Sequence, residues 1–179
     1  MRIISGSYRG RQIHPPSNFK ARPTTDFSKE GLFNILYNNF EFDEIDVLDL
    51  FAGTGSVTYE FASRGTKRVV CVENNSLHFR FIRKNVEDMQ LEQVHTINTD
   101  VFKFLKKPFE SYDLIFADPP YDNKELSKLP DLVFETNILL DNGWFILEHP
   151  SQLTFNHHPN FFQHKNYGNV NFSFFKKKE

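Results

Sequence analysis

The stretch that decides the fold is Asp49-Leu50-Phe51-Ala52-Gly53-Thr54-Gly55-Ser56. It ends a short apolar run that starts at Ile45, and it leads into a helical stretch that ends at Arg64-Gly65. A strand that turns through glycines into a helix is typical of open α/β sheets, where the missing Cβ lets a ligand approach the backbone. The sequence therefore predicts a ligand site at this turn.

The rest of the chain alternates between segments with the apolar pattern of a strand and segments with that of a helix. Further strands are predicted at 68–73, 94–97, 112–117 and 144–147, and helices at 26–38, 76–89, 101–105 and 125–134. Such alternation favours a mainly parallel sheet with helices on both faces and right-handed connections. Segments 161–165 and 170–175 flank Tyr167-Gly168-Asn169, which predicts an antiparallel hairpin.

Three local signals refine these boundaries. Residues 1–14 are interpreted as a short hairpin that turns at Gly6 and Gly10. Thr25 or Asp26 is the expected N-cap of the first helix, and Asn75 that of the helix at 76–89. The apolar face predicted for the helix at 76–89 contains Leu77, Phe81, Ile82, Val86 and Met89.

Composition places the chain among folded globular proteins. With 179 residues, 39% hydrophobic and 25% charged, it fits one domain, here 1–179, and excludes a disordered chain. No apolar run approaches the ~18 residues of a membrane span, and the first residues lack a signal peptide's apolar core, so we expect a cytoplasmic protein. The single cysteine, Cys71, excludes an intrachain disulfide, and the histidines show no metal-ligand spacing. We therefore expect no metal.

Charge is distributed unevenly although the net charge is only −2. Residues 1–40 contain six Lys or Arg against two acids, whereas 41–60 contain six acids and no base. This asymmetry predicts a polyanion-binding face at the amino terminus, with Arg9, Arg11, Lys20 and Arg22 as candidates. A solvated charge run, or pairing of these residues with the acidic stretch, fits the same pattern.

Candidate ligand-binding residues lie where the predicted strands end. A nicotinamide or flavin site would carry a third glycine where this chain has Thr58, so that interpretation is disfavoured. Asp49 instead suits a cationic ligand such as the amino-acid end of S-adenosylmethionine, and Glu73 can accept two hydrogen bonds from a ribose diol. The alternative interpretation is that this strand-to-helix turn has only a structural role and that Asp49 faces solvent. The predicted cofactor-binding set is Asp49, Phe51, Gly53, Gly55, Glu73, Asn74, Asp100 and Val101.

A second motif, Asp118-Pro119-Pro120-Tyr121, follows the predicted strand 112–117. Its prolines fix two φ angles and remove two backbone donors, so the segment presents a carboxylate and carbonyl acceptors. Asp118 and the Pro119 carbonyl can hold the two N–H groups of an exocyclic amine, and Tyr121 can stack on the base. We therefore expect Asp118, Pro119, Pro120 and Tyr121 to form the catalytic set.

Taken in order, the motifs DLFAGTGS (49–56), VEN (72–74) and DPPY (118–121) resemble those of class I S-adenosylmethionine-dependent methyltransferases. The segments RIISGSYRGR (2–11), RPTTD (22–26) and LFNIL (32–36) are similar to the amino-terminal signature of the bacterial RsmD family. The resemblance departs at 56–60, where the family usually has small residues and a further glycine, and it is loose over 122–160.

The resemblance implies a Rossmann-like α/β sheet of order 3-2-1-4-5-7-6 with strand 7 antiparallel. A basic hairpin and helix at 1–40 would extend a catalytic core at 41–179. The implied cofactor is S-adenosyl-L-methionine, and the implied reaction is methylation of the N2 amine of a guanine in 16S ribosomal RNA. The partner would be that RNA or an assembling small ribosomal subunit, with no membrane involved, and we expect a monomer.

Two alternatives stay open on sequence grounds. A DNA adenine-N6 methyltransferase shares DPPY, but it normally carries a target-recognition domain for which 179 residues leave little space. A ribosome-assembly factor could hold S-adenosylmethionine or RNA without catalysis.

Overall fold

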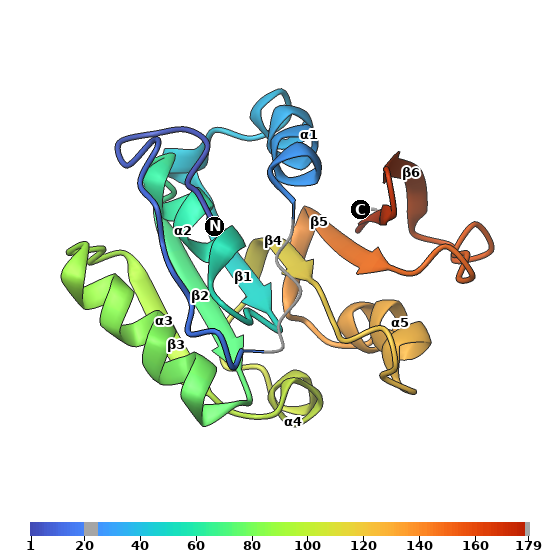
Figure 1. Ribbon diagram of the computed structural model, residues 1–179. Coiled ribbons are helices and arrows are strands. Elements are labelled where there is room, and N and C mark those ends of the chain that lie inside the picture. The colour runs from blue at the N-terminus through green and yellow to red at the C-terminus, as the bar shows by residue number, and fades with distance from the viewer. Residues whose placement is uncertain (20–24, 178–179) are drawn as a thin grey trace.

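The computed structural model describes residues 1–19 and 25–177 (Figure 1). Its core is one seven-stranded sheet of order β3-β2-β1-β4-β5-β7-β6. The strands are β1 (Asp46–Leu50), β2 (Arg68–Glu73), β3 (Val94–Asn98), β4 (Tyr112–Ala117), β5 (Leu139–His149), β6 (Phe161–Tyr167) and β7 (Val170–Lys176). The helices are α1 (Asp26–Tyr37), α2 (Ser56–Ser63), α3 (Ser76–Asp88), α4 (Val101–Lys106) and α5 (Leu129–Phe134), with 3-10 turns η1 (Phe42–Glu44) and η2 (Leu126–Lys128).

Strand pairing confirms the expected topology. Strands β1 to β5 pair in parallel, whereas β7 pairs antiparallel with both β5 and β6. Leu50 is level with Val72 and with Ala117, and Ala117 is level with Leu147. Because parallel strands end at the same edge of a sheet, the residues that follow these positions are brought together there.

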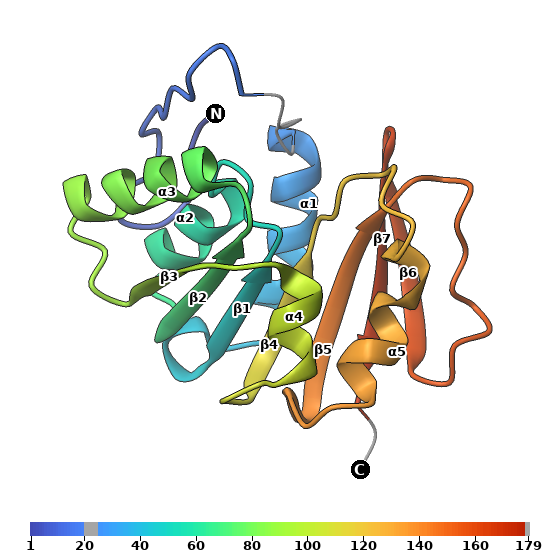
Figure 2. The ribbon, with the colours of Figure 1, turned by 90° about the horizontal axis from the view of Figure 1, so that it is seen from below.

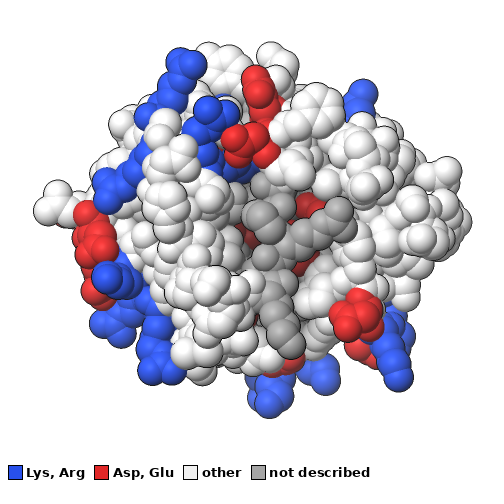
Figure 3. Space-filling model, viewed as in Figure 1, with Lys and Arg blue, Asp and Glu red and all other residues white. Residues whose placement is uncertain are grey.

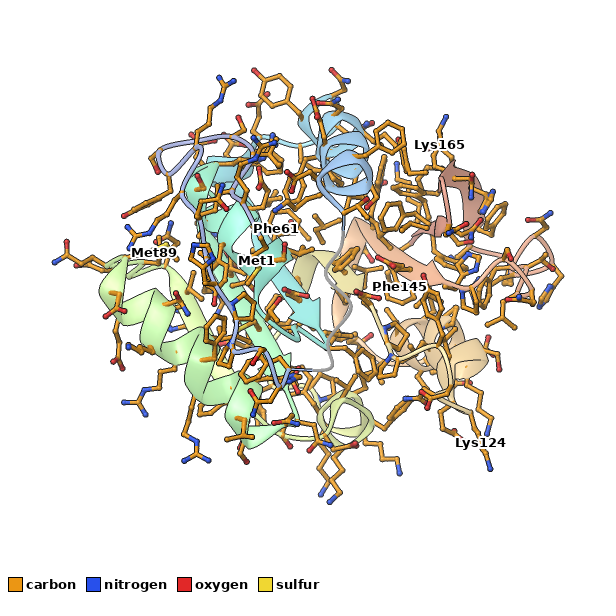
Figure 4. The ribbon with its side chains drawn as sticks, viewed as in Figure 1. Met1, Phe61, Met89, Lys124, Phe145 and Lys165 are labelled. Atoms are coloured by element: carbon orange, nitrogen blue, oxygen red, sulfur yellow. The ribbon has the colours of Figure 1, made fainter. Side chains whose placement is uncertain are left out.

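The sheet separates two apolar layers. Figure 2 shows α1, α2 and α3 on one face and α4 and α5 on the other. The cluster under α1, α2 and α3 contains Phe61, and that under α4 and α5 contains Phe145; both side chains are fully buried and are labelled in Figure 4. Cys71 is buried on β2. In the part of the chain that the structure describes, no helix is long and apolar enough to cross a membrane.

The capping residues act as their chemistry predicts. Thr25 Oγ1 accepts from the Ser28 amide at 3.2 Å and begins α1. Asn75 Oδ1 accepts from the Leu77 amide at 2.9 Å and begins α3. Each side chain satisfies an N–H group that has no partner within its own helix.

Four expectations need correction. Residues 1–14 reverse direction, but they form only one isolated bridge, between Arg2 and Gln12, rather than a regular hairpin. The predicted helix at 125–134 is divided into η2 and the short α5, which has Pro130 in its first turn. The strand predicted at 144–147 extends over Leu139–His149, with a register shift at its start. Leu77 is 54% exposed, because it lies in the first turn of α3, beyond the packed part of that face.

Buried polar groups attach the amino-terminal segment (residues 1–14) to α2. Glu60 is fully buried, and its two carboxylate oxygens accept from the amides of Ile4 at 2.8 Å and Ser5 at 3.0 Å. Lys29 is also buried; its ammonium donates to the Arg2 carbonyl at 2.6 Å and lies 3.5 Å from Glu60. The segment is therefore part of the packed structure, with Met1 next to Thr54 of the glycine turn and Ser7 next to Ser63 at the end of α2.

Candidate functional site

A cavity of about 800 Å³ opens at the carboxyl edge of the sheet. This volume lies in the range of about 300–1,000 Å³ typical of small-molecule sites. Eleven of the twelve predicted cofactor-binding and catalytic residues line it: Asp49, Phe51, Gly53, Glu73, Asn74, Asp100, Val101, Asp118, Pro119, Pro120 and Tyr121. The structure thus brings the two motifs together in one cavity.

Glu73 is the last residue of β2, and its carboxylate is hydrogen-bonded to the glycine turn. Its Oε2 accepts from the Gly53 amide at 2.7 Å, and its Oε1 accepts from the Asn75 amide at 2.6 Å. These two bonds hold the carboxylate in one orientation against the cavity, where each oxygen has further acceptor capacity. Glu73 is therefore suited to receive hydroxyl donors from a ligand.

Asp49 lies deeper, near the end of β1, and is 1% exposed. Burial raises the pKa of its carboxyl group to about 7; the hydrogen bond from Thr58 opposes the shift and the nearby Glu73 adds to it. Thr58 Oγ1 donates to Asp49 Oδ2 at 2.5 Å. A cationic ligand group in the cavity would stabilise the ionised form of this carboxyl group. Asp49 is buried, so the expectation of a solvated acid in the structural alternative is wrong.

The backbone of the turn is strained beside the cavity. Phe51 has a φ of 61°, a left-handed conformation that is unusual for a bulky residue. Gly55, the twelfth predicted residue, is not among those that line the cavity. Its φ is 83°, and a Cβ there would come within 2.6 Å of the Tyr59 ring. Gly55 therefore allows the turn to form without facing the cavity. A side chain at this position would collide with Tyr59 rather than with a ligand.

Residues that follow β3 form another part of the cavity wall. Asp100 is the N-cap of α4, since its Oδ1 accepts from the Lys103 amide at 2.9 Å, and it also lines the cavity beside Val101. Asp100 therefore both caps α4 and lines the cavity. Asn74 follows β2, and its carbonyl accepts from Asn98 Nδ2 at 3.1 Å.

The DPPY segment leaves β4 along the cavity. The Asp118 amide donates to the Leu50 carbonyl at 3.4 Å, which keeps the segment next to the end of β1. Tyr121, 37% exposed, donates from its hydroxyl to Glu148 Oε1 at 3.0 Å. Glu148 is near the end of β5, is buried and lines the same cavity. The DPPY segment and β5 together therefore present an aromatic ring and two carboxylates, Asp118 and Glu148, to one space.

The described basic candidates lie on the tip of the amino-terminal segment, next to Ser63 at the end of α2. Arg9 and Arg11 are exposed, and the Arg11 guanidinium is 6.0 Å from the centre of the Tyr8 ring. Figure 3 shows Lys and Arg side chains gathered over the tip of the amino-terminal segment, and acidic side chains nearer the centre of that face. Lys20 and Arg22 lie outside the described residues.

Sequence reasoning missed two residues of the site. Glu148 has no place in the predicted site, and its neighbour His149 is buried and hydrogen-bonded to Ser173 at 2.8 Å. An acid near the end of the strand next to DPPY is the signal that could have identified Glu148. Thr58 was noted only as a missing glycine, although its position one turn into α2 suits a hydrogen bond to Asp49.

Known proteins resemble the chain over most of its length. Residues 1–176 match the family model described as Conserved hypothetical protein 95. A ribosomal RNA small subunit methyltransferase D from Buchnera aphidicola subsp. Baizongia pistaciae is 32% identical over 153 residues, which cover 86% of this chain and 78% of that protein. The protein of that name from Haemophilus influenzae is 34% identical over 152 residues, which cover 83% and 78%.

A solved structure agrees with these matches. The yhhF protein from Escherichia coli superposes with a TM-score of 0.86 at 26% identity, covering 99% of this chain and 98% of that one. The strand order and the antiparallel β7 are those of the class I methyltransferase sheet that the motifs implied. This chain therefore belongs to the Conserved hypothetical protein 95 family, the RsmD family that its motifs resemble.

Proposed function

We propose that this protein transfers a methyl group from S-adenosylmethionine to the exocyclic N2 amine of a guanine in 16S ribosomal RNA. The observation that carries the proposal is the convergence of Glu73, Asp49 and DPPY on one cavity. Relatives named as small-subunit ribosomal RNA methyltransferases support the substrate class.

The residues present fit the cofactor. S-adenosylmethionine supplies a methyl group that is already activated by its sulfonium charge. Glu73, held by the amides of Gly53 and Asn75, is the acceptor for the ribose diol. Asp49, on β1, is the carboxyl group for the cationic amino-acid end of the cofactor. Phe51, Asn74, Asp100 and Val101 complete the binding walls.

The chemistry at the acceptor depends on positioning. Asp118 and the Pro119 carbonyl accept hydrogen bonds from the two N–H groups of the target amine, and Tyr121 stacks on its base. Holding the amine at the methyl group in this way accounts for up to roughly 7–11 kcal/mol of barrier lowering in well-oriented reactions. As the nitrogen–carbon bond forms and the sulfur–carbon bond breaks, the amine becomes acidic, and Asp118 is in place to receive its proton.

RNA binding extends beyond the cavity. Arg9 and Arg11 are the described candidates for contacts with phosphate groups, which attract cations regardless of base sequence. Lys20 and Arg22 belong to the same proposal on sequence grounds alone.

Nucleoside mass spectrometry tests the proposal. Ribosomal RNA from a strain that lacks this gene should lose one N2-methylguanosine, which the unaltered chain should restore and Asp118→Ala should not. An unchanged set of modified nucleosides would contradict the proposal. New N6-methyladenine in DNA would favour the DNA enzyme instead, and binding of S-adenosylmethionine without turnover on 16S RNA would favour an assembly factor.

A further inference from the structure

The carboxyl edge of the sheet places a second carboxylate beside the DPPY motif. Ala117 and Leu147 are paired in the parallel register of β4 and β5, so Asp118 and Glu148 follow at neighbouring positions. Both line the cavity, and Glu148 is only 5% exposed. Burial of a carboxylate is costly unless its hydrogen bonds are satisfied, which makes this position demanding for a purely structural role.

Tyr121 orients the Glu148 carboxylate. Its hydroxyl donates to Oε1 at 3.0 Å, and its ring lines the cavity. One end of Tyr121 therefore faces the carboxylate while its ring offers a surface for stacking. A base that stacks on Tyr121 would have its edge within the reach of Glu148 as well as of Asp118.

An ionised carboxylate only accepts hydrogen bonds. The Watson–Crick edge of guanine carries N1–H directly beside the N2 amine, so its donors are contiguous. Adenine carries an acceptor, N1, beside its N6 amine. An additional carboxylate next to the amine-binding acceptors therefore favours guanine, and its lone pairs would repel the N1 atom of adenine.

We propose that Glu148 determines the base specificity of this site by accepting a hydrogen bond from guanine N1–H while Asp118 accepts from the N2 amine. This inference rests on the proposed function and adds to it the residue that reads the base. A base with an acceptor at N1 would face the Glu148 carboxylate with no proton between them, and such a mismatch at a site built for hydrogen bonding is strongly discriminating.

The test uses two RNA substrates that differ in the target nucleoside. One carries guanosine and the other 2-aminopurine riboside, which keeps the N2 amine but has an acceptor at N1. The unaltered enzyme should prefer guanosine by about 10²-fold in kcat/KM. Glu148→Gln should reduce the preference to below about 10-fold, because its amide can donate to N1. The missing O6 atom of 2-aminopurine affects both enzymes alike.

Tyr121→Phe is the matched control. It removes the hydroxyl that orients Glu148 but leaves the carboxylate, so the preference for guanosine should be reduced less than in Glu148→Gln, even if the overall rate falls. Calorimetry of S-adenosylmethionine binding shows whether each variant is folded around its cofactor cavity.

An equal preference for guanosine in the unaltered enzyme and in Glu148→Gln would overturn the inference while leaving the proposed function intact. Methylation of neither RNA by the unaltered enzyme would instead overturn the proposed function, and the inference with it. If Glu148→Gln methylates neither RNA, the inference is tested by binding instead. The affinities of both proteins are measured for RNAs that carry inosine or purine riboside at the target position. The unaltered enzyme should favour inosine and the variant should not; equal preferences would again overturn the inference.

Discussion

The Gly53 amide donates to Oε2 of Glu73 across 2.7 Å, which joins the turn after β1 to the end of β2. One carboxylate thus shapes the glycine turn and faces the cavity. Because its other oxygen accepts from Asn75 at 2.6 Å, the orientation of Glu73 is set before any ligand arrives. A preorganised acceptor of this kind does not have to be ordered when the ligand binds.

We expect Glu73→Ala to weaken S-adenosylmethionine binding by roughly 10- to 150-fold, equivalent to about 1.5–3 kcal/mol for hydrogen bonds to a charged group. Isothermal titration calorimetry measures the change. Glu87→Ala on the exposed face of α3 is the matched control and should bind normally. Unchanged affinity in Glu73→Ala would remove Glu73 from the cofactor site.

Asp49 should make the free protein less stable as pH rises. Its pKa is raised from 3.8 to about 7 by burial, so between these values the folded state binds a proton that the unfolded state has released. The free energy of unfolding should therefore fall by about 2 kcal/mol between pH 5 and pH 7 relative to Asp49→Asn. Urea denaturation of both proteins at the two pH values measures this difference. Parallel pH dependences would show that Asp49 is ionised throughout.

Asp118→Ala should separate chemistry from cofactor binding. The carboxylate is assigned to the acceptor amine, so we expect S-adenosylmethionine affinity to stay nearly constant while the single-turnover rate falls by ~10²-fold or more. Rapid-quench methylation with saturating cofactor measures the rate, and Asp141→Ala, on an exposed part of β5, controls for loss of an acid. A full rate in Asp118→Ala would assign the amine to other acceptors.

Replacing Arg9 and Arg11 together with Ala should weaken binding of target and non-target RNA by a similar factor. Each lost phosphate contact lowers the slope of log affinity against log salt by up to about 0.9, so the slope should become shallower by one to two units. RNA affinity at three salt concentrations measures it. Lys165→Ala, on β6 and far from the amino-terminal segment in Figure 4, should leave the slope unchanged. A lower thermal stability with an unaltered slope would give both arginines a structural role.

The sequence was most informative where local chemistry decides structure. The limits of β2 and β4, and the caps Thr25 and Asn75, followed from strand composition and side-chain oxygens. Strand order rested on the family resemblance. Once the strand order is given, the predicted site residues must lie close together, because parallel strands end at one edge of the sheet.

What could not be predicted depended on contacts between distant segments. Glu60 looked like one acid of a charged stretch, and Lys29 like one base of a polyanion-binding face, yet each is buried and the two lie 3.5 Å apart. Gly55 was assigned to the ligand, whereas the atom that a Cβ would meet belongs to Tyr59. Neither the burial nor the collision can be read from spacing along the chain.

The attachment of residues 1–14 to α2 limits how the protein can be engineered. Ile4 and Ser5 donate to Glu60, and the Ser7 and Tyr8 amides donate to the Ser63 carbonyl at 2.7 Å and to its hydroxyl at 3.0 Å. All four donors are backbone N–H groups, which a segment of any sequence provides, whereas the Glu60 and Ser63 side chains on α2 supply acceptors that depend on residue identity. A chimaera that exchanges residues 1–14 for those of a relative therefore depends on an α2 that keeps Glu60 and Ser63.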